Sequence, residues 1–427
     1  MALVLTGATI IAVDGNNEVL TGSDVRIEGP IIAAVGPSLA EPGDAVLDCS
    51  DGVIVPGLVN VHTHAATGLY RGLADDLPRE FWPPAFRVPG QECFRLEDYQ
   101  QSLRAVCAEL LLNGVTCIAD RLDNMDKLAP VIAASGLRAV VGHTLSDARG
   151  VADWATCDRV IETYGIDPAR RVFAGLAPHA LDSCSDSLLR ACASRAERLG
   201  CRIFIHVAQS AAEVAAIRSR GYSGALSCLV ATGLVGPHVV AAHGIYLTDA
   251  EIAAWPRHGM SIAHCPASNL KLEARTLAIH RLHGKVAIGL GTDWAASNNS
   301  WDLLAEARLA ALVGKLLADD PTVLKAQDII RLLTIDAARV LGLDHMIGSI
   351  EPGKRADLLV FDANRLSMSP MHDPVANIIY SAGNRAIRDV MVDGEWCVRH
   401  GSLVRGEEAT LAKAHSRLAE LAMRRRS

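Results

Sequence analysis

Short apolar runs alternate with longer amphipathic stretches through the middle of the chain. Several runs are almost continuously apolar, among them 139–141, 203–205 and 239–242, which is typical of parallel strands buried on both faces. Polar residues or glycines close most of these runs. The pattern predicts eight buried strands: 54–64, 116–121, 137–145, 172–179, 202–209, 239–246, 260–268 and 286–293.

Helical spacing fills the gaps between the predicted strands. Apolar residues between 103 and 111 recur at intervals of three and four, and a similar stripe runs from 188 to 199. Strands that alternate with amphipathic helices form parallel sheets, and eight such strands close a barrel. We therefore predict an α/β fold with a (β/α)8 TIM barrel over 56–350, in preference to a doubly wound open sheet.

The two ends of the chain share a different pattern. Residues 1–55 are short apolar segments separated by turn residues, and the same pattern of short segments recurs over 351–405. We predict that 1–55 and 351–405 pair into one small composite β-sandwich domain. The final stretch, 406–427, is rich in Ala, Leu, Glu and Arg, which favours a surface helix.

The composition of this 427-residue chain limits the classes of partner that it is expected to bind. Its formal net charge is −7 and its basic run is confined to 424–426, so the pattern does not favour nucleic acid or anionic lipid. No stretch approaches the roughly 20 apolar residues of a membrane span, and the first residues lack the basic region of an export signal. Eleven cysteines without a Cys-x-x-Cys pair fit reduced thiols. We expect a cytoplasmic protein with a small-molecule partner, no nucleic acid and no membrane.

Polar side chains that could carry chemistry end five of the predicted strands: His62 with His64, His179, His206, His243 and Asp293. Functional residues of such barrels lie at the carboxyl ends of the strands. Residues i and i+2 of a strand point to the same side, so His62 and His64 face the barrel mouth together. With His206 and Asp293 they form a ligand set that suits a catalytic zinc ion and leaves a position open for water.

A His-x-His pair alone is weak evidence for a metal, because a lone buried histidine is usually just hydrogen-bonded. The stronger signal is that each candidate separately ends a predicted barrel strand, in the right order along the chain. We therefore predict one metal ion per chain, bound by His62, His64, His206 and Asp293.

Several motifs, taken in chain order, resemble those of the amidohydrolase superfamily. They are Pro56-Gly57-Leu58-Val59-Asn60-Val61-His62-Thr63-His64, Arg71-Gly72, Pro178-His179, His206-Val207-Ala208-Gln209, Ala242-His243-Gly244, Pro266-Ala267-Ser268-Asn269 and Gly291-Thr292-Asp293. The most similar branch comprises the methylthioadenosine and S-adenosylhomocysteine deaminases together with the triazine chlorohydrolases. The resemblance covers essentially the whole chain, as far as 351–357.

This resemblance implies a zinc hydrolase in which the four predicted ligands bind Zn²⁺, with Fe²⁺ or Mn²⁺ as alternatives. It further implies that His243 positions a hydroxide generated on the metal, that Asp293 takes the water proton and that His179 reaches the substrate. The hydroxide then attacks a ring carbon of a nitrogen heterocycle, and ammonia, an amine or a halide leaves. Because many relatives in the family are dimers or larger, we also expect a homo-oligomer.

Three positions that face the substrate in the family differ in this chain. Gln209 stands where the family has a glutamate that carries a proton to the ring nitrogen, and an amide cannot transfer a proton in that way. Counted from the motifs, Gln91 replaces a ribose-binding glutamate and His143 replaces an arginine. All three changes remove charge, so the family's nucleoside substrates do not transfer to this chain. Trp294, next to Asp293, is a further candidate to line the pocket.

Three hypotheses of function remain open at this stage. The first is a deaminase-like hydrolase that removes an amino, alkylamino or halide group from a nitrogen heterocycle, another acid near Gln209 supplying the proton. The second is hydrolysis of an amide or cyclic amide, with Asp293 as the sole proton shuttle. The third is a non-catalytic binding protein that keeps the barrel and the zinc, against which the intact His243 and Asp293 argue.

Overall fold

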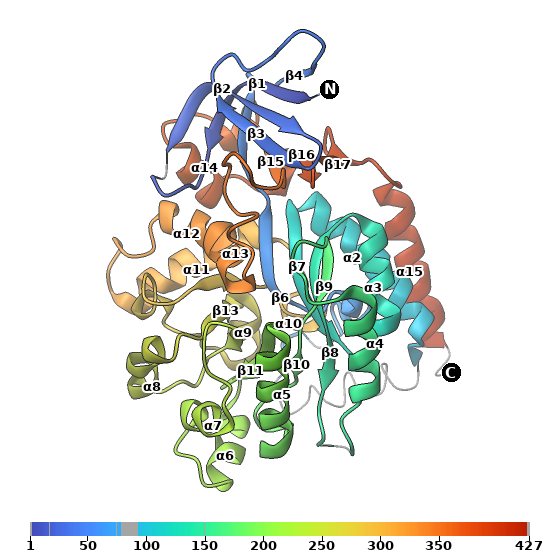
Figure 1. The fold of residues 1–427 in the computed structure, drawn as a ribbon, viewed down its shortest axis with the longest axis vertical. Coiled ribbons are helices and arrows are strands. Elements are labelled where there is room, and N and C mark those ends of the chain that lie inside the picture. Colours follow the sequence, from blue (N-terminus) through green and yellow to red (C-terminus); the bar gives the residue numbers. More distant parts are fainter. Residues whose placement is uncertain (1, 17, 74, 78–92, 149, 425–427) are drawn as a thin grey trace.

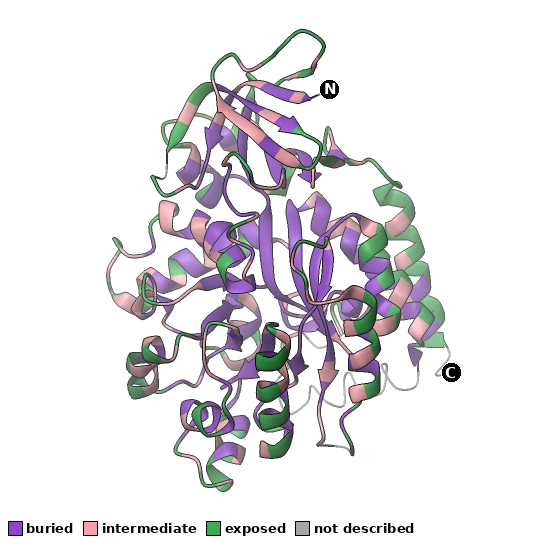
Figure 2. Ribbon diagram, in the orientation of Figure 1, coloured by how far each residue is buried: buried purple, intermediate pink, exposed green. Residues whose placement is uncertain are grey.

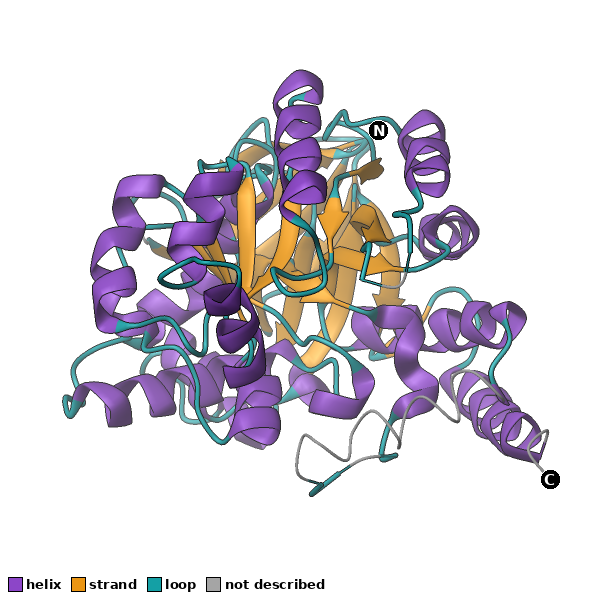
Figure 3. Ribbon diagram, turned by 90° about the horizontal axis from the view of Figure 1, so that it is seen from below, coloured by secondary structure: helices purple, strands orange, loops and turns teal. Residues whose placement is uncertain are grey.

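The computed structural model describes residues 2–16, 18–73, 75–77, 93–148 and 150–424. Strands occupy the centre of the molecule and helices surround them (Figure 3). A further sheet lies at one end and contains strands from both ends of the chain (Figure 1). Among the residues described, no helix combines the length and the apolar character that crossing a membrane requires.

Nine strands form this end sheet, in the order β18-β17-β16-β15-β5-β1-β2-β3 with β4 beside β1. Their bounds are β1 (Leu3–Ile11), β2 (Val19–Glu28), β3 (Ile31–Gly36), β4 (Ala45–Asp48), β5 (Gly52–Pro56), β15 (Leu358–Asp362), β16 (Ile387–Val392), β17 (Glu395–Arg399) and β18 (Ser402–Leu403). The antiparallel pair β5 and β15, with Pro56 opposite Leu358, joins the two ends of the chain. Pairing of the chain ends is therefore confirmed, as one continuous hydrogen-bonded sheet; a sandwich of two sheets stays a prediction.

Two parallel sheets form the centre of the molecule, one ordered β10-β8-β7-β6 with β9 beside β8, the other β11-β12-β13-β14. Their bounds are β6 (Leu58–Thr63), β7 (Val115–Leu122), β8 (Arg138–Leu145), β9 (Val172–Ala174), β10 (Ala177–Pro178), β11 (Ile203–Val207), β12 (Val239–His243), β13 (Ser261–His264) and β14 (Ile288–Leu290). Isolated bridges link the sheets at both edges, Ala180 to His206 at one and Thr63 to Asp293 at the other. All eight predicted strand regions contain strands, in two sheets joined by isolated bridges.

Glycines break two of the predicted strands. Gly57 separates β5, in the end sheet, from β6, and a Cβ added there would lie 2.1 Å from Oγ1 of Thr116. Gly175 separates β9 from β10, and its Cβ would lie 2.9 Å from the ring of Phe204. The last strand, β14, is shorter than predicted, and Asp293 follows it with a φ of 59°. The backbone therefore turns sharply where it presents this carboxylate.

The helices follow the apolar stripes of the sequence. In α2 (Leu96–Leu112) every residue of the predicted stripe is buried. In α5 (Asp186–Leu199) the Ser185 hydroxyl accepts the Leu188 amide at the start, and Gly200 in the left-handed region ends the helix. The remaining α-helices are α3 (Met125–Ser135), α4 (Trp154–Tyr164), α6 (Ala211–Ser219), α7 (Ala225–Thr232), α8 (Asp249–Ala254), α9 (Pro266–Glu273), α10 (Ala295–Asn298), α11 (Leu303–Ala318), α12 (Ala326–Leu333), α13 (Ile335–Leu341), α14 (Pro374–Tyr380) and α15 (Glu408–Arg424).

The predicted C-terminal helix is α15, which lies alongside α2 (Figure 1). The imidazole of His415 and the hydroxyl of Ser102 are 3.1 Å apart and join the two helices. Most of α15 is exposed, whereas the central strands are buried (Figure 2). The helix is therefore a surface element, as predicted.

Side chains from both parallel sheets meet in one apolar cluster, here called the inner cluster, which α13 also joins. Its strand members are Val59, Val61, Cys117, Ala119, Val140, Phe173, Phe204, Val240, Ala242 and Ala263. A larger cluster packs the other faces of the strands against the surrounding helices. Alternation along each strand therefore decides which side chains face the inner cluster and which face the helices.

Arg138, the first residue of β8, ties the parallel strands to the end sheet. Its side chain is fully buried, and its Nε lies 2.9 Å from Oδ2 of Asp357, while Nη2 contacts Asp393. Burial alone would lower the pKa of Arg138, but the two carboxylates raise it above its ordinary value. The amino ends of the strands are thus held by a buried ionic network.

Candidate metal centre

The five strongest candidates of the sequence lie together at the carboxyl ends of the central strands. His62 is in β6 and His64 follows its last residue; His206 is in β11 and His243 ends β12. Asp293 lies just beyond β14, and its amide donates to the His62 carbonyl oxygen over 3.0 Å. Ring centroids of His62 and His243 are 5.3 Å apart. The structure therefore brings together residues that are up to 231 positions apart in the sequence.

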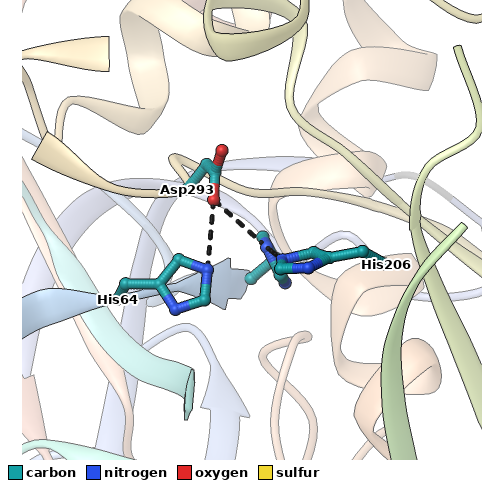
Figure 4. Close-up of side chains that lie close together, drawn as sticks. His64, His206 and Asp293 are labelled. Carbon is teal, nitrogen blue, oxygen red and sulfur yellow. Dashed lines mark hydrogen bonds and ion pairs between the residues drawn. The ribbon is translucent and has the colours of Figure 1, made fainter. Parts of the chain in front are cut away.

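Four of these side chains have the geometry of a metal site. One donor atom from each of His62, His64, His206 and Asp293 lies within 4.8 Å of the others. Oδ1 of Asp293 is 3.3 Å from Nε2 of both His62 and His64, and Nε2 of His206 is 3.2 Å from that of His62. In Figure 4 the Asp293 carboxylate points toward the imidazoles of His64 and His206. Ligands of a zinc ion with bonds of about 2.0–2.1 Å lie about 3.3 Å apart, which matches these spacings, so the donor set fits zinc.

Neighbouring acceptors fix two of the imidazoles. Nδ1 of His64 donates to the carbonyl oxygen of Arg121 over 2.6 Å, and Nδ1 of His243 donates to Oδ1 of Asn269 over 2.9 Å. A histidine whose second nitrogen donates to a fixed acceptor keeps its first nitrogen free for a metal or a substrate. The Nε2 atoms of His64 and His243 are therefore available for chemistry.

Two hydroxyl groups fix the carboxylate of Asp293. Its Oδ2 accepts from Ser268 over 2.6 Å and from Ser297 over 3.1 Å. These contacts leave Oδ1 facing the histidines. One carboxylate oxygen is thus held by the protein, and the other is presented to the candidate metal position.

Burial sets the protonation of this cluster. Burial lowers the pKa of His62 to about 3, and it also lowers the pKa values of His206 and His243. Burial alone would raise the pKa of Asp293, but its contacts with the imidazoles of His62 and His64 hold it well below its ordinary value. At neutral pH His62, His206 and His243 are therefore neutral and Asp293 is ionised, which are the forms that bind a divalent ion.

The residues predicted to contact substrate occupy different surroundings. The His179 ring is 5.1 Å from that of His206, and its Nδ1 is 2.6 Å from the Ser183 hydroxyl. Gln209 follows β11 and is partly buried. Trp294 is partly buried with its ring 5.9 Å from that of Tyr70.

The other two predicted substrate residues stand apart from this group. His143 is buried, with Nε2 3.6 Å from the carboxylate of Asp153, which caps α4. On β8, residues 139, 141 and 145 face the surrounding helices, and His143 continues that face by alternation. Gln91 lies outside the described residues.

Sequence reasoning missed several polar residues around the site. Glu213 is buried, and its carboxylate accepts the amides of Ala208 and Gln209, which fixes the turn after β11. His264 ends β13 and is buried, and burial lowers its pKa to about 3. Arg121, near the end of β7, contacts His206. His264 and Arg121 lie near strand ends, so the rule that identified the other candidates also applies to them.

The family follows from comparison with known proteins. The family model described as the amidohydrolase family matches residues 53–397. The chain belongs to the amidohydrolase family. The resemblance predicted from the motifs is therefore confirmed, and so is the prediction of a metal-dependent enzyme of the aminohydrolase type.

Named relatives cover almost the whole of this amidohydrolase. It is 36% identical over 433 residues to the 5-methylthioadenosine/S-adenosylhomocysteine deaminase of Desulforudis audaxviator, covering 98% of each chain. It is 32% identical over 428 residues to the 5'-deoxyadenosine deaminase of Methanosarcina mazei, covering 99% of each.

Two solved structures are similar along nearly their full length. An adenosine deaminase from Xanthomonas campestris with bound zinc gives a TM-score of 0.93 at 31% identity, covering 99% of this chain and 98% of that one. An atrazine chlorohydrolase from Arthrobacter aurescens complexed with zinc gives 0.90 at 23% identity, covering 98% of this chain and 100% of that one. The second likeness shows a shared fold.

Proposed function

We propose that this amidohydrolase is a zinc-dependent, deaminase-like hydrolase that removes ammonia, an amine or a halide from a ring carbon of a nitrogen heterocycle. The observation that carries the proposal is the four-ligand cluster with His243 beside it. Relatives named as deaminases of adenosine derivatives support a nitrogen heterocycle as the substrate class, and a zinc-containing neighbour supports the metal.

Each polar group at the site has a distinct task in this proposal. A bound zinc ion supplies Lewis acidity that makes water nucleophilic near neutral pH. Asp293 takes the proton of the attacking water, because its second oxygen is held by two hydroxyls and its carboxylate stays ionised. His243 orients the nucleophile and the developing oxyanion, with its ring fixed by Asn269. His179, Gln209 and Trp294 contact the substrate ring.

Gln209 favours a second candidate function, hydrolysis of an amide or cyclic amide. The Glu213 carboxylate four residues later accepts two backbone amides, so it positions Gln209 and its oxygens are engaged there. An amide side chain donates a hydrogen bond but cannot protonate a ring nitrogen. Asp293 alone could relay a proton from water to a leaving amide nitrogen. In this alternative, Gln209 binds the substrate by hydrogen bonds only.

We also propose the architecture that the strand pairing leaves open. The bridges at both edges of the two parallel sheets, together with the shared inner cluster, favour closure into one (β/α)8 barrel over 56–350. In this division 1–55 and 351–405 form the second domain, and 406–427 is the terminal helix. A cytoplasmic homo-oligomer remains part of the proposal.

The first experiment measures metal content and product release on the purified protein. A panel of aminopurines, aminopyrimidines, pterins, chlorotriazines and cyclic amides is assayed for ammonia, amine, halide and ring opening, with Asp293→Asn as the inactive control. We expect one zinc per chain and ammonia from an aminated ring, with Gln209→Glu changing the pH profile. Ring opening without ammonia moves the assignment to cyclic amides, and protein that binds no divalent metal contradicts the site itself.

A further inference from the structure

Arg121 is a buried cation beside the candidate metal centre, and the roles described so far do not use its side chain. It lies in β7, one residue before the strand ends, and is 2% exposed. We propose that Arg121 is a positioning residue: its guanidinium locks the ends of β10 and β11 and thereby orients His206 for metal binding and His179 for the substrate. This inference rests on the metal site of the proposed function.

The guanidinium spans two neighbouring strand ends. Nη1 donates to the carbonyl oxygens of Pro178 and Phe204, over 2.9 and 3.1 Å. Nη2 donates to the carbonyl oxygen of His179 over 3.0 Å and lies 2.8 and 3.1 Å from Nδ1 and Nε2 of the His206 ring. β10 and β11 belong to different sheets and otherwise meet through isolated bridges. Arg121 therefore strengthens the seam on which His179 and His206 both lie.

Strand β8 lies between Arg121 and the strand ends that it contacts, and β8 leaves space for the Arg121 side chain to cross. Arg121 continues the inner face of β7 that Cys117 and Ala119 form by alternation. Its register partner on β8 is Gly142, which carries no side chain. A Cβ at Gly142 would lie 2.7 Å from the Cβ of Ala177. The close packing at Gly142 thus brings β10 near enough for a side chain from β7 to contact it.

Arg121 supports ligands from two strands in two different ways. Its carbonyl oxygen accepts from His64, and its guanidinium holds the carbonyl oxygens of the strand ends and contacts the His206 ring. His64 and His243 are held by acceptors, whereas guanidinium offers donors only. A substitution at position 121 keeps the backbone carbonyl oxygen that accepts from His64 and removes the guanidinium group. The expected defect is therefore confined to His206 and His179, while His64 keeps its partner.

The charge of Arg121 and its geometry predict opposite effects on zinc binding. Burial lowers the pKa of Arg121 to about 10, so the group is still a cation at neutral pH. A cation next to the ion repels it, and removing the charge alone would tighten zinc binding. Losing the contacts that orient a ligand histidine weakens metal binding by about 10- to 100-fold. Substitution by Lys keeps the positive charge and removes the planar guanidinium group with its fixed donors, whereas substitution by Met removes both the charge and the donors.

The chain provides a matched control in Arg138. It is equally buried, it lies on the adjacent strand, and it also bridges separate elements, but at the amino ends of the strands. Arg138→Lys and Arg138→Met therefore report the cost of disturbing a buried arginine without disturbing the metal centre.

The experiment measures zinc affinity by competition with a chromophoric chelator, for the wild type, Arg121→Lys, Arg121→Met, Arg138→Lys and His62→Ala. We expect both Arg121 variants to bind zinc about tenfold more weakly or worse and Arg138→Lys to match the wild type. In the assay of the best panel substrate, zinc-saturated Arg121→Lys should show a raised KM, because His179 loses its anchor.

The remaining possible results would overturn either the positioning role of Arg121 or the proposed function. Equal zinc affinity in the wild type and Arg121→Lys overturns the positioning role, and tighter binding by Arg121→Met assigns the residue to charge alone. If Arg121→Lys fails to fold while Arg138→Lys folds, Arg121 belongs to the fold and the proposal is overturned. If wild type and His62→Ala bind zinc equally weakly, the proposed function fails instead.

Discussion

Two buried arginines on neighbouring strands, Arg121 and Arg138, show how differently the two ends of the central sheets are built. Arg138 begins β8 and is paired with two carboxylates, Asp357 and Asp393. Arg121 lies near the end of β7, donates to three carbonyl oxygens and contacts the ring of His206. One cation is neutralised by charge, whereas the other is satisfied by dipoles next to a candidate metal site.

The difference separates stability from chemistry along the strands. At the amino end, complementary charges pair with one another and join the parallel strands to the end sheet. At the carboxyl end, donor atoms of three histidines and one carboxylate converge, and burial keeps His62 neutral. Such a cluster contributes little to folding until an ion binds it. Changes at the two ends should therefore affect different observables.

The largest expected contrast is between two buried aspartates, Asp293 and Asp357. Asp293→Asn should lower kcat by at least about 10³-fold, because the amide cannot accept the water proton. Asp357→Asn should lower the free energy of unfolding and leave kcat within about twofold, because it lies at the opposite end. Steady-state turnover and urea unfolding on both variants check this. A large loss of kcat in folded Asp357→Asn would show that the two ends are coupled.

The next contrast concerns stability. Arg138→Met leaves Asp357 buried without its cation, while Asp393 keeps Arg171, and the change should cost about 3–5 kcal/mol of unfolding free energy. Urea unfolding of zinc-free protein measures the loss, and zinc affinity should stay that of the wild type. A cost below about 1 kcal/mol would mean that the ionic network contributes little to holding the end sheet in place.

A pH effect of intermediate size should come from His264. No described residue lies within hydrogen-bond reach of its Nδ1, and burial lowers its pKa to about 3, from about 6.5 when unfolded. The unfolded chain therefore binds a proton below about pH 6.5 that the folded protein does not, so stability falls as the pH is lowered from 6.5 toward 3.

Between pH 6 and 4 the expected loss from His264 is about 1 kcal/mol per pH unit. His264→Gln should remove that part of the slope in urea unfolding of metal-free protein. Identical slopes for the wild type and His264→Gln would mean that His264 takes up a proton in the folded state.

Strand positions and strand-ending histidines could be predicted from the sequence, because both depend on local patterns. Apolar runs gave the eight strand regions, and His62, His64, His206 and Asp293 follow from their ends. Alternation on β8 would also have placed His143 on the helix-facing side with residues 139 and 141. The same alternation places His243 with residues 239 and 241, so alternation alone does not set His143 apart from the site histidines.

The parts that could not be predicted depend on contacts between distant segments. The break at Gly57 arises because Thr116 packs against it, which no local pattern reveals. The direction of the Arg121 side chain depends on Gly142 and on the positions of β10 and β11. Long side chains with many rotamers take their direction from such packing. The sequence therefore predicts which residues reach the carboxyl end more readily than how they are held there.

The smallest predicted effect separates two histidines that both stood as substrate residues. His179→Asn should raise KM about tenfold, because its ring lies 5.1 Å from that of His206 at the mouth of the site. His143→Asn should change KM by less than about threefold, because its imidazole faces Asp153 at the start of α4. The expected tenfold and threefold changes correspond to about 1.4 and 0.7 kcal/mol. KM values on one panel substrate decide the matter: an equal rise in both variants would place His143 in the substrate pocket after all, with the α4 start forming its wall.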